Sequence, residues 1–195
     1  MTSVFAAACA VLGAGAAALG QFAGGVNIDF NSAVGSGAGQ PTVLFPGAAG
    51  QGGYWNPVNP PFTHLSSRAI RNLGNSADAV FCLFLTSAGG TGTASADNPA
   101  TSGDAELLFD DVHNLGGTGS TVTYSIGAFA PGVYEVYTYA VAPDDAAYLT
   151  RIGVRTNGDG AAADRVVGGV IPAGGVLTEG VTHARHTVVL SAAGP

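Results

Sequence analysis

The sequence contains no lysine, and only 10% of its 195 residues are charged. The basic residues are six arginines scattered along the chain, and the formal net charge is -7 at pH 7. A protein that binds DNA or RNA needs clustered basic side chains to displace the counterions of the phosphates. The composition therefore argues against nucleic acid as a partner. It argues against binding to anionic lipid surfaces for the same reason.

Cysteines and catalytic motifs are also scarce. The chain has two cysteines, Cys9 in the apolar N-terminal run and Cys82 in the apolar run AVFCLFL. A single cysteine in a β core behaves as a small hydrophobic residue, so Cys82 is predicted to be structural. No G-x-S-x-G motif is present, and no pair of carboxylates stands in a recognisable catalytic context. We therefore predict a protein without catalytic activity.

The first 25 residues carry no charge at all, and the run from Val4 to Leu19 is apolar. Ala18-Leu19-Gly20 offers the small residues that a signal peptidase requires. We predict that residues 1–20 are a secretory signal peptide and that the protein is secreted, extracellular or displayed at the cell surface. Two other interpretations stay open. The run approaches the length of a membrane anchor, or it is a buried segment of the fold.

Long amphipathic helices are missing as well, whereas 31 glycines and many short apolar or alternating runs are present. Runs of this kind, separated by Gly, Pro, Asn and Asp, predict strands joined by turns. With 47% hydrophobic residues the chain can bury one core, so residues 21–195 are predicted to form a single all-β domain, an antiparallel sandwich or barrel. The expected strands are 26–30, 41–45, 66–73, 79–86, 120–129, 132–141, 150–156, 164–172 and 185–191.

Three local features sharpen this prediction. Both alternating sets of residues in 132–141 are largely apolar, so this strand is expected to be central and buried on both faces, with Glu135 beside an arginine. Asn-Gly and Asp-Gly in 157–160 predict a hairpin loop. The small residues of 86–103 predict one long loop.

Five segments together resemble a known family: VNIDFNSA, GAAGQGGYWN, GDAELLFDDVHN, GAFAPGVYEVYTYAVAPD and GVTHARHTVVLSAAG. They are similar to secreted, galactose-binding-like jelly-roll domains of surface and matrix proteins in planctomycete-type bacteria. The resemblance spans nearly all of residues 26–194 and implies an antiparallel jelly-roll β-sandwich. It further implies a non-catalytic module that binds carbohydrate or extracellular matrix.

One departure from the family concerns its last strand, which closes the sheet next to the first strand. Here the chain stops at Pro195, where that strand is expected. Either the domain is truncated or a neighbouring molecule supplies the strand. An unpaired edge is a template for another chain. The alternative function is therefore a structural subunit that assembles through sheet edges into a homo-oligomer or filament.

The segment GDAELLFDDVHNLGG places Asp110, Asp111 and His113 close together in a chain with little charge. Adjacent residues of a strand point to opposite faces, so the two carboxylates meet on one ion only where the backbone turns. We expect this run to cap a turn and bind backbone amides. Asp110 and Asp111 are candidate ligands of a structural calcium ion at most, because calcium takes oxygen donors. No other cofactor is predicted.

Tyr54 and Trp55 are the predicted ligand-binding residues. They lie in GQGGYWNPVNPPF, a loop rich in Gly, Pro and Asn, and aromatic rings stack on the apolar faces of sugars. The alternative is that Trp55, the single tryptophan, packs inside the protein. His183 and His186 flank Arg185 without an identifiable nucleophile, so an exposed polar strand end is expected there.

Overall fold

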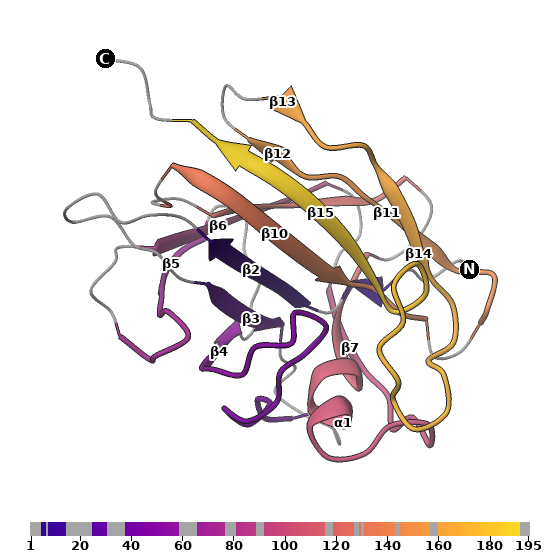
Figure 1. Ribbon diagram of the computed structural model, residues 1–195. Helices are drawn as coiled ribbons and strands as arrows, with labels where there is room; N and C mark the ends of the chain where they lie inside the picture. Colours follow the sequence, from indigo (N-terminus) through magenta and orange to yellow (C-terminus); the bar gives the residue numbers. More distant parts are fainter. Residues whose placement is uncertain are drawn as a thin grey trace.

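The computed structural model describes residues 5–6, 8–14, 25–30, 38–58, 66–76, 81–88, 92–115, 119–126, 129, 131–142, 145–156 and 160–191. Among these residues strands greatly outnumber helix, which confirms the prediction of an all-β protein. Within the described ranges, no helix has the length and apolar character needed to cross a membrane. The helix α1 (Asp104–Phe109) is drawn in Figure 1 together with the strands β1 (Phe5–Ala6), β2 (Ala8–Ala14), β3 (Val26–Phe30), β4 (Trp55–Val58), β5 (Ser66–Ile70), β6 (Phe81–Ala88), β7 (Gly92–Ser95), β8 (Asp111–Asn114), β9 (Thr121–Ile126), β10 (Gly132–Tyr139), β11 (Leu149–Ile152), β12 (Arg155–Thr156), β13 (Gly160–Ala161), β14 (Arg165–Gly168) and β15 (His183–Leu190).

The largest sheet has five strands in the order β15-β10-β2-β3-β4. Its strands are antiparallel except for β3 and β4, which pair in parallel, contrary to the purely antiparallel expectation. Two sheets of three strands, β5-β6-β9 and β1-β8-β7, and the pairs β11-β14 and β12-β13 complete the described strands. None of these sheets closes on itself within the described part of the chain.

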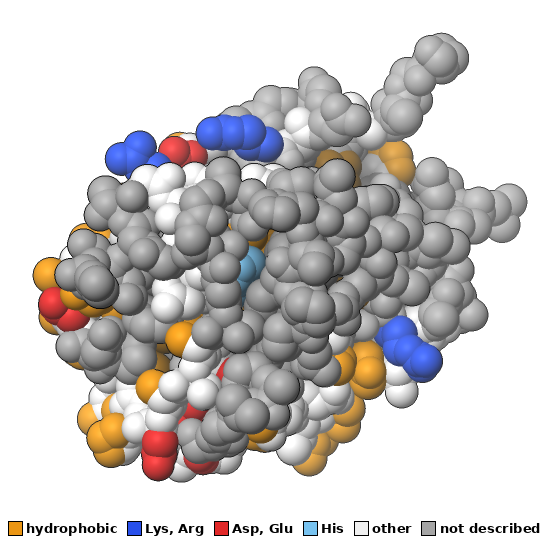
Figure 2. All heavy atoms as spheres, turned by 180° about the vertical axis from the view of Figure 1, so that it is seen from behind, with side chains coloured by type: hydrophobic (Ala, Val, Ile, Leu, Met, Phe, Trp, Pro, Cys, Tyr) orange, Lys and Arg blue, Asp and Glu red, His pale blue; other side chains and the backbone are white. Residues whose placement is uncertain are grey.

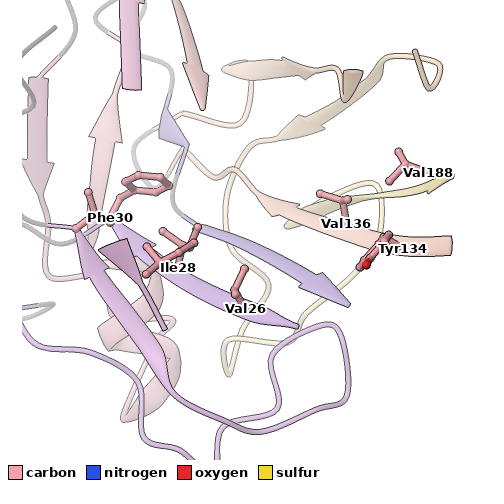
Figure 3. Packing of buried hydrophobic residues seen from close by; sticks show 8 residues of the cluster. Val26, Ile28, Phe30, Tyr134, Val136 and Val188 are labelled. Atoms are coloured by element: carbon pink, nitrogen blue, oxygen red, sulfur yellow. The ribbon is translucent and has the colours of Figure 1, made fainter. Parts of the chain in front are cut away.

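The main core lies between the five-stranded sheet and the sheet β5-β6-β9. Alternate residues of a strand point to the same face, so Val26, Ile28 and Phe30 of β3 project together toward the second sheet. Tyr134, Val136 and Val188 of β10 and β15 extend the same cluster (Figure 3). Phe30 meets Tyr124 of β9 with ring centroids 4.3 Å apart. This contact joins the two sheets.

The predicted leader segment is part of the five-stranded sheet in this structure. β2 pairs with β10 from Cys9 to Ala14 and with β3 from Ala8 to Val11. This placement makes residues 8–14 of the N-terminal run a strand of the sheet. The strand position beside β3, expected to be unfilled, is therefore occupied by β2, with β4 on the other side. Cleavage after residue 20 stays a prediction.

β10 is central in its sheet, as predicted, because it lies between β15 and β2. The prediction that both of its faces are buried is wrong. Tyr134 and Val136 are buried on the core face, whereas Val133 on the other face is 47% exposed. Alternation of apolar residues on both faces does not distinguish a covered face from an open one. Glu135 lies beside an arginine as expected, since Arg185 Nε is 2.6 Å from Glu135 Oε2.

Several boundaries also differ from the prediction. Residues 41–45 are a turn rather than a strand, and Trp55–Val58, expected in a loop, forms β4. The predicted long loop 86–103 contains the end of β6 and all of β7. The predicted hairpin loop falls mainly on residues 157–159, which lie outside the described residues; the flanking strands β12 and β13 pair antiparallel.

Candidate functional site

The acidic segment that the sequence singled out lies at the junction of α1 and β8. The segment forms the helix α1 and, directly after Asp110, the strand β8. Leu108 and Phe109 at the end of α1 are fully buried in a second core cluster. Val112 of β8 belongs to the same cluster. Buried residues therefore fix the backbone on both sides of Asp110 and Asp111.

Asp110 holds the loop that precedes the helix. Its Oδ2 accepts a hydrogen bond of 2.9 Å from the backbone N–H of Asn98, and its Oδ1 accepts one of 2.7 Å from the hydroxyl of Thr101. The backbone N–H of Ala96 donates to the carbonyl oxygen of Asp110 over 2.8 Å. These bonds agree with the interpretation that this run stabilises a turn by binding backbone amides.

Asp110 also belongs to a group of three carboxylates near the surface. Oxygen atoms of Asp97, Glu106 and Asp110 all lie within 4.8 Å of one another, and no other such group of metal-ligating residues exists among the described residues. The predicted pair for calcium was Asp110 with Asp111, but Asp111 is not in this group. The reason is the one stated from the sequence, that adjacent residues project in different directions. Glu106 precedes Asp110 by four residues, a spacing that could have indicated their proximity.

Asp111 points into the protein, where it lies near a carboxylate that the sequence analysis missed. The side chains of Asp111 on β8 and Asp29 on β3 are both completely buried. Burial raises the pKa of Asp29 well above its usual range, and the charge of Asp111 raises that pKa further. Asp29 is the single charged residue in the apolar strand VNIDF, which is the signal that could have found it.

His113 follows Asp111 on the same side of β8 and is also completely buried. Its Nδ1 lies 2.6 Å from the hydroxyl of Tyr124, with which it shares a hydrogen bond. Burial lowers the pKa of His113 to about 4, so the imidazole is neutral at pH 7. Because Asp29, Asp111 and His113 expose no surface, a proton or a small ion fits this interior site better than an organic substrate.

The two predicted aromatic ligand-binding residues, Tyr54 and Trp55, differ in how far they are buried. Trp55 is completely buried, so a sugar cannot stack on its indole. Its Nε1 donates to the carbonyl oxygen of Phe45 over 3.4 Å, and the two rings lie 5.8 Å apart. This is the packing alternative, and the prediction that Trp55 binds a ligand is wrong for this arrangement. Tyr54 is half-buried and stays a candidate.

The expectation of an exposed polar strand end at His183 and His186 is also wrong. Both histidines are buried, with 5% and 3% of their surface exposed. They are three residues apart on β15 and therefore point to opposite faces of the sheet. Burial lowers the pKa of each. The ring of His183 contacts those of Tyr137 and Tyr139, with centroids 6.0 and 5.8 Å away.

A more accessible arrangement of polar and aromatic side chains lies on β10 and β15. We call it the open sheet face, and its members are Val133, Glu135, Tyr137, Arg185, Thr187 and Val189. Register places Val133 beside Val189, Glu135 beside Thr187, and Tyr137 beside Arg185. All six are half-buried or exposed, and in Figure 1 no other element lies in front of these parts of β10 and β15.

Hydrogen bonds organise the polar centre of the open sheet face. Glu135 Oε2 accepts a bond of 2.6 Å from Arg185 Nε, and Glu135 Oε1 accepts one of 2.7 Å from the hydroxyl of Thr187. The bond from Arg185 lowers the pKa of Glu135, so the carboxylate is ionised at neutral pH. The sequence suggested an arginine beside Glu135 but not which one, because the register of distant strands sets the pairing.

Comparison with known proteins identifies no relative, since no protein-family model, no curated protein and no solved structure matches the chain.

The bonds of Asp110 lead to a test of its structural role. We expect Asp110→Ala to lower the free energy of unfolding by about 1–3 kcal/mol, because it removes the acceptors for Asn98 and Thr101. Urea denaturation measures this change. Asp145→Ala is the matched control, because Asp145 accepts one bond in an exposed turn and its loss should cost about 0.5 kcal/mol or less. Equal effects of the two substitutions would contradict the structural role of Asp110.

Proposed function

We propose that this chain is a secreted, non-catalytic module that binds carbohydrate or extracellular matrix at the cell surface, and that its sheets belong to a jelly-roll sandwich. The observation that carries the proposal is the open sheet face. There Tyr137 lies beside Arg185, which is hydrogen-bonded to Glu135. The resemblance to secreted surface domains, stated from the sequence, favours the same function.

The chemistry of the open sheet face suits a sugar. A tyrosine ring offers an apolar surface against the C–H groups of a pyranose, and its hydroxyl stays available to solvent or ligand. Arg185, Glu135 and Thr187 supply donors and acceptors for sugar hydroxyls. Because Glu135 already bonds both of its neighbours, the three side chains are partly ordered before binding. Such ordering reduces the entropy lost when a ligand binds.

Charge favours a neutral glycan over an acidic one. The formal net charge of -7 repels polyanions at long range. The open sheet face itself includes one arginine, Arg185, and it is paired with Glu135. Figure 2 shows the opposite side of the molecule, where the described arginines also lie at separate places rather than in one patch. A sulfated or uronic acid polymer would need such a patch, as nucleic acid would. We therefore propose neutral polysaccharides as the ligand class.

Affinity electrophoresis through gels that contain galactomannan, xyloglucan or mixed-linkage glucan tests this function. We expect at least one polymer to retard the wild-type chain, and Tyr137→Ala to weaken that retardation at least tenfold, because the ring supplies the apolar contact. Tyr54→Ala tests the other tyrosine candidate, a half-buried residue outside the open sheet face. If only Tyr54→Ala weakens binding, the ligand contacts the loop before β4 instead. If no neutral polymer retards the wild-type chain, the proposed function is wrong.

The second candidate function is that of a structural subunit which assembles through sheet edges. The position of β2 favours it, because this strand comes from the segment predicted to be a cleaved leader. Removal of that segment would leave β10 and β3 with unpaired edges on the two sides of one empty strand position. A strand from another molecule can fill a position of this kind, as in donor-strand exchange.

A further inference from the structure

Asp29 is the least compensated charged group in the described part of the structure. Its side chain is completely buried, and neither carboxylate oxygen has a hydrogen-bond partner among the described residues. The residues beside it in register are Ala8 on β2 and Pro57 on β4, two residue types without a polar side-chain group. Burying an ionised carboxylate without a partner is very unfavourable, so this position requires a further species.

The charged residue known to act on Asp29 is another carboxylate, which does not compensate its negative charge. Asp111 lies close enough for its charge to oppose the ionisation of Asp29. The arginines whose side chains are described, Arg71, Arg151, Arg155, Arg165 and Arg185, are all exposed. His113 on the same side of β8 is neutral at pH 7. None of these described basic residues therefore balances Asp29.

We propose that Asp29 and Asp111 bind a hard divalent cation, such as Ca²⁺, in the interior between β3 and β8. Two carboxylates supply the oxygen donors that such cations prefer, and the positive charge removes the repulsion between them. His113 is not counted as a ligand, since Asp29, Asp111 and His113 do not form a group whose ligand atoms all lie within 4.8 Å of one another.

This site differs from the surface group of Asp97, Glu106 and Asp110. Both oxygens of Asp110 already accept hydrogen bonds from the loop 98–101, so the surface group is explained by structure alone. Asp29 has no such explanation. The proposal is also independent of sugar binding, because the residues of the open sheet face are not in the interior pair.

The test uses the full chain, freed of metal with EDTA and dialysed at pH 7.5. CaCl₂, MgCl₂ and MnCl₂ are titrated separately by calorimetry, and thermal unfolding is followed with and without each salt. We expect one ion to bind per chain and to raise Tm, because a ligand of the folded state alone stabilises it. Asp29→Asn should weaken binding at least tenfold and remove the rise in Tm. Asp97→Asn, the matched control at the surface group, should keep both.

The alternative occupant of Asp29 is a proton, and pH distinguishes it from a cation. A raised folded-state pKa means that the folded protein holds a proton that the unfolded chain releases near pH 4. Without metal, the stability of wild type relative to Asp29→Asn should therefore fall as pH rises from 5 to 9. This difference cancels the contributions of the histidines, including His113. Addition of the cation at pH 8 should restore the lost stability.

Two results would overturn the proposal. If none of the three salts binds or raises Tm, the carboxyl group of Asp29 holds a proton instead. If Asp97→Asn removes the response to cation and Asp29→Asn keeps it, the ion is at the surface group. Asp111→Asn provides a second interior variant should Asp29→Asn fail to fold, and it is expected to show the same loss of cation response.

Discussion

A chain that begins at Gln21 is expected to lose its stable monomeric fold. Deletion of residues 1–20 removes β2, which pairs with β10 over six residues and with β3 over four. Each lost backbone hydrogen bond costs roughly 1 kcal/mol net, and a domain has only about 5–15 kcal/mol in total. β10 and β3 would then be separated by two strand spacings of about 4.8 Å each. Circular dichroism on heating should show a greatly lowered or absent cooperative transition.

Sedimentation of the same chain at micromolar concentration separates two consequences of the deletion. If the open position recruits a strand from another molecule, the chain forms dimers or larger assemblies, and a peptide of residues 8–14 added in excess should return it to monomers. A chain that lacks only residues 1–4 is the control and should remain a stable monomer. A stable monomer that begins at Gln21 would contradict the role of β2, and it would be compatible with a cleaved leader.

Local sequence patterns predicted the strands whose hydrophobic residues follow a simple period. Val26–Phe30 was predicted with the same boundaries as β3, and β10 and β15 were predicted to within a few residues. The turn signals around 157–160 lie between β12 and β13, which pair antiparallel. These features depend on interactions between residues close in sequence, and such interactions can be inferred from a single amino-acid sequence.

Other strands depend on distant partners. β4 has the sequence WNPV inside a segment rich in Gly, Pro and Asn, which indicates a loop. The side chain of Asn56 makes this strand possible, because it donates to the carbonyl oxygens of Asn27 and Arg71 and accepts from the backbone N–H of Arg71. An asparagine side chain that replaces backbone pairing has no periodic signature. β2 was missed for a related reason, since a short apolar run rich in alanine and glycine fits a leader equally well.

In the candidate site too, some features follow from the local sequence and others depend on distant partners. Asp110, Asp111 and His113 were recognised because charge is rare in this chain, but their environments depend on which elements meet them. Asp29 lies more than eighty residues before Asp111, and only the packing of β3 against β8 brings them near each other. The alternation of side chains along a strand indicated that Asp110 and Asp111 diverge unless the backbone turns between them. It did not indicate which of the two would point inward.

Trp55→Ala is expected to destabilise the protein strongly. The indole is completely buried in the core cluster that contains Phe109 and Tyr139. A methyl group added at Gly47 would lie 3.3 Å from the indole and 2.6 Å from the hydroxyl of Tyr139, so the surroundings are tightly packed. Loss of a buried tryptophan costs about 3–5 kcal/mol, because the cavity collapses only in part. In a protein of this size, Tm should fall by roughly 6–20 °C.

Tyr54→Ala is the control that separates packing from ligand binding at this pair. Its half-buried ring should contribute less to stability, so the free energy of unfolding should fall by less than half of the change for Trp55→Ala. At a temperature where Trp55→Ala is still folded, its retardation in polysaccharide gels should equal that of wild type, because a buried indole cannot contact a sugar. Weaker retardation with an unchanged Tm would instead mean that Trp55 reaches the surface when a ligand binds, and the packing role argued above would be wrong.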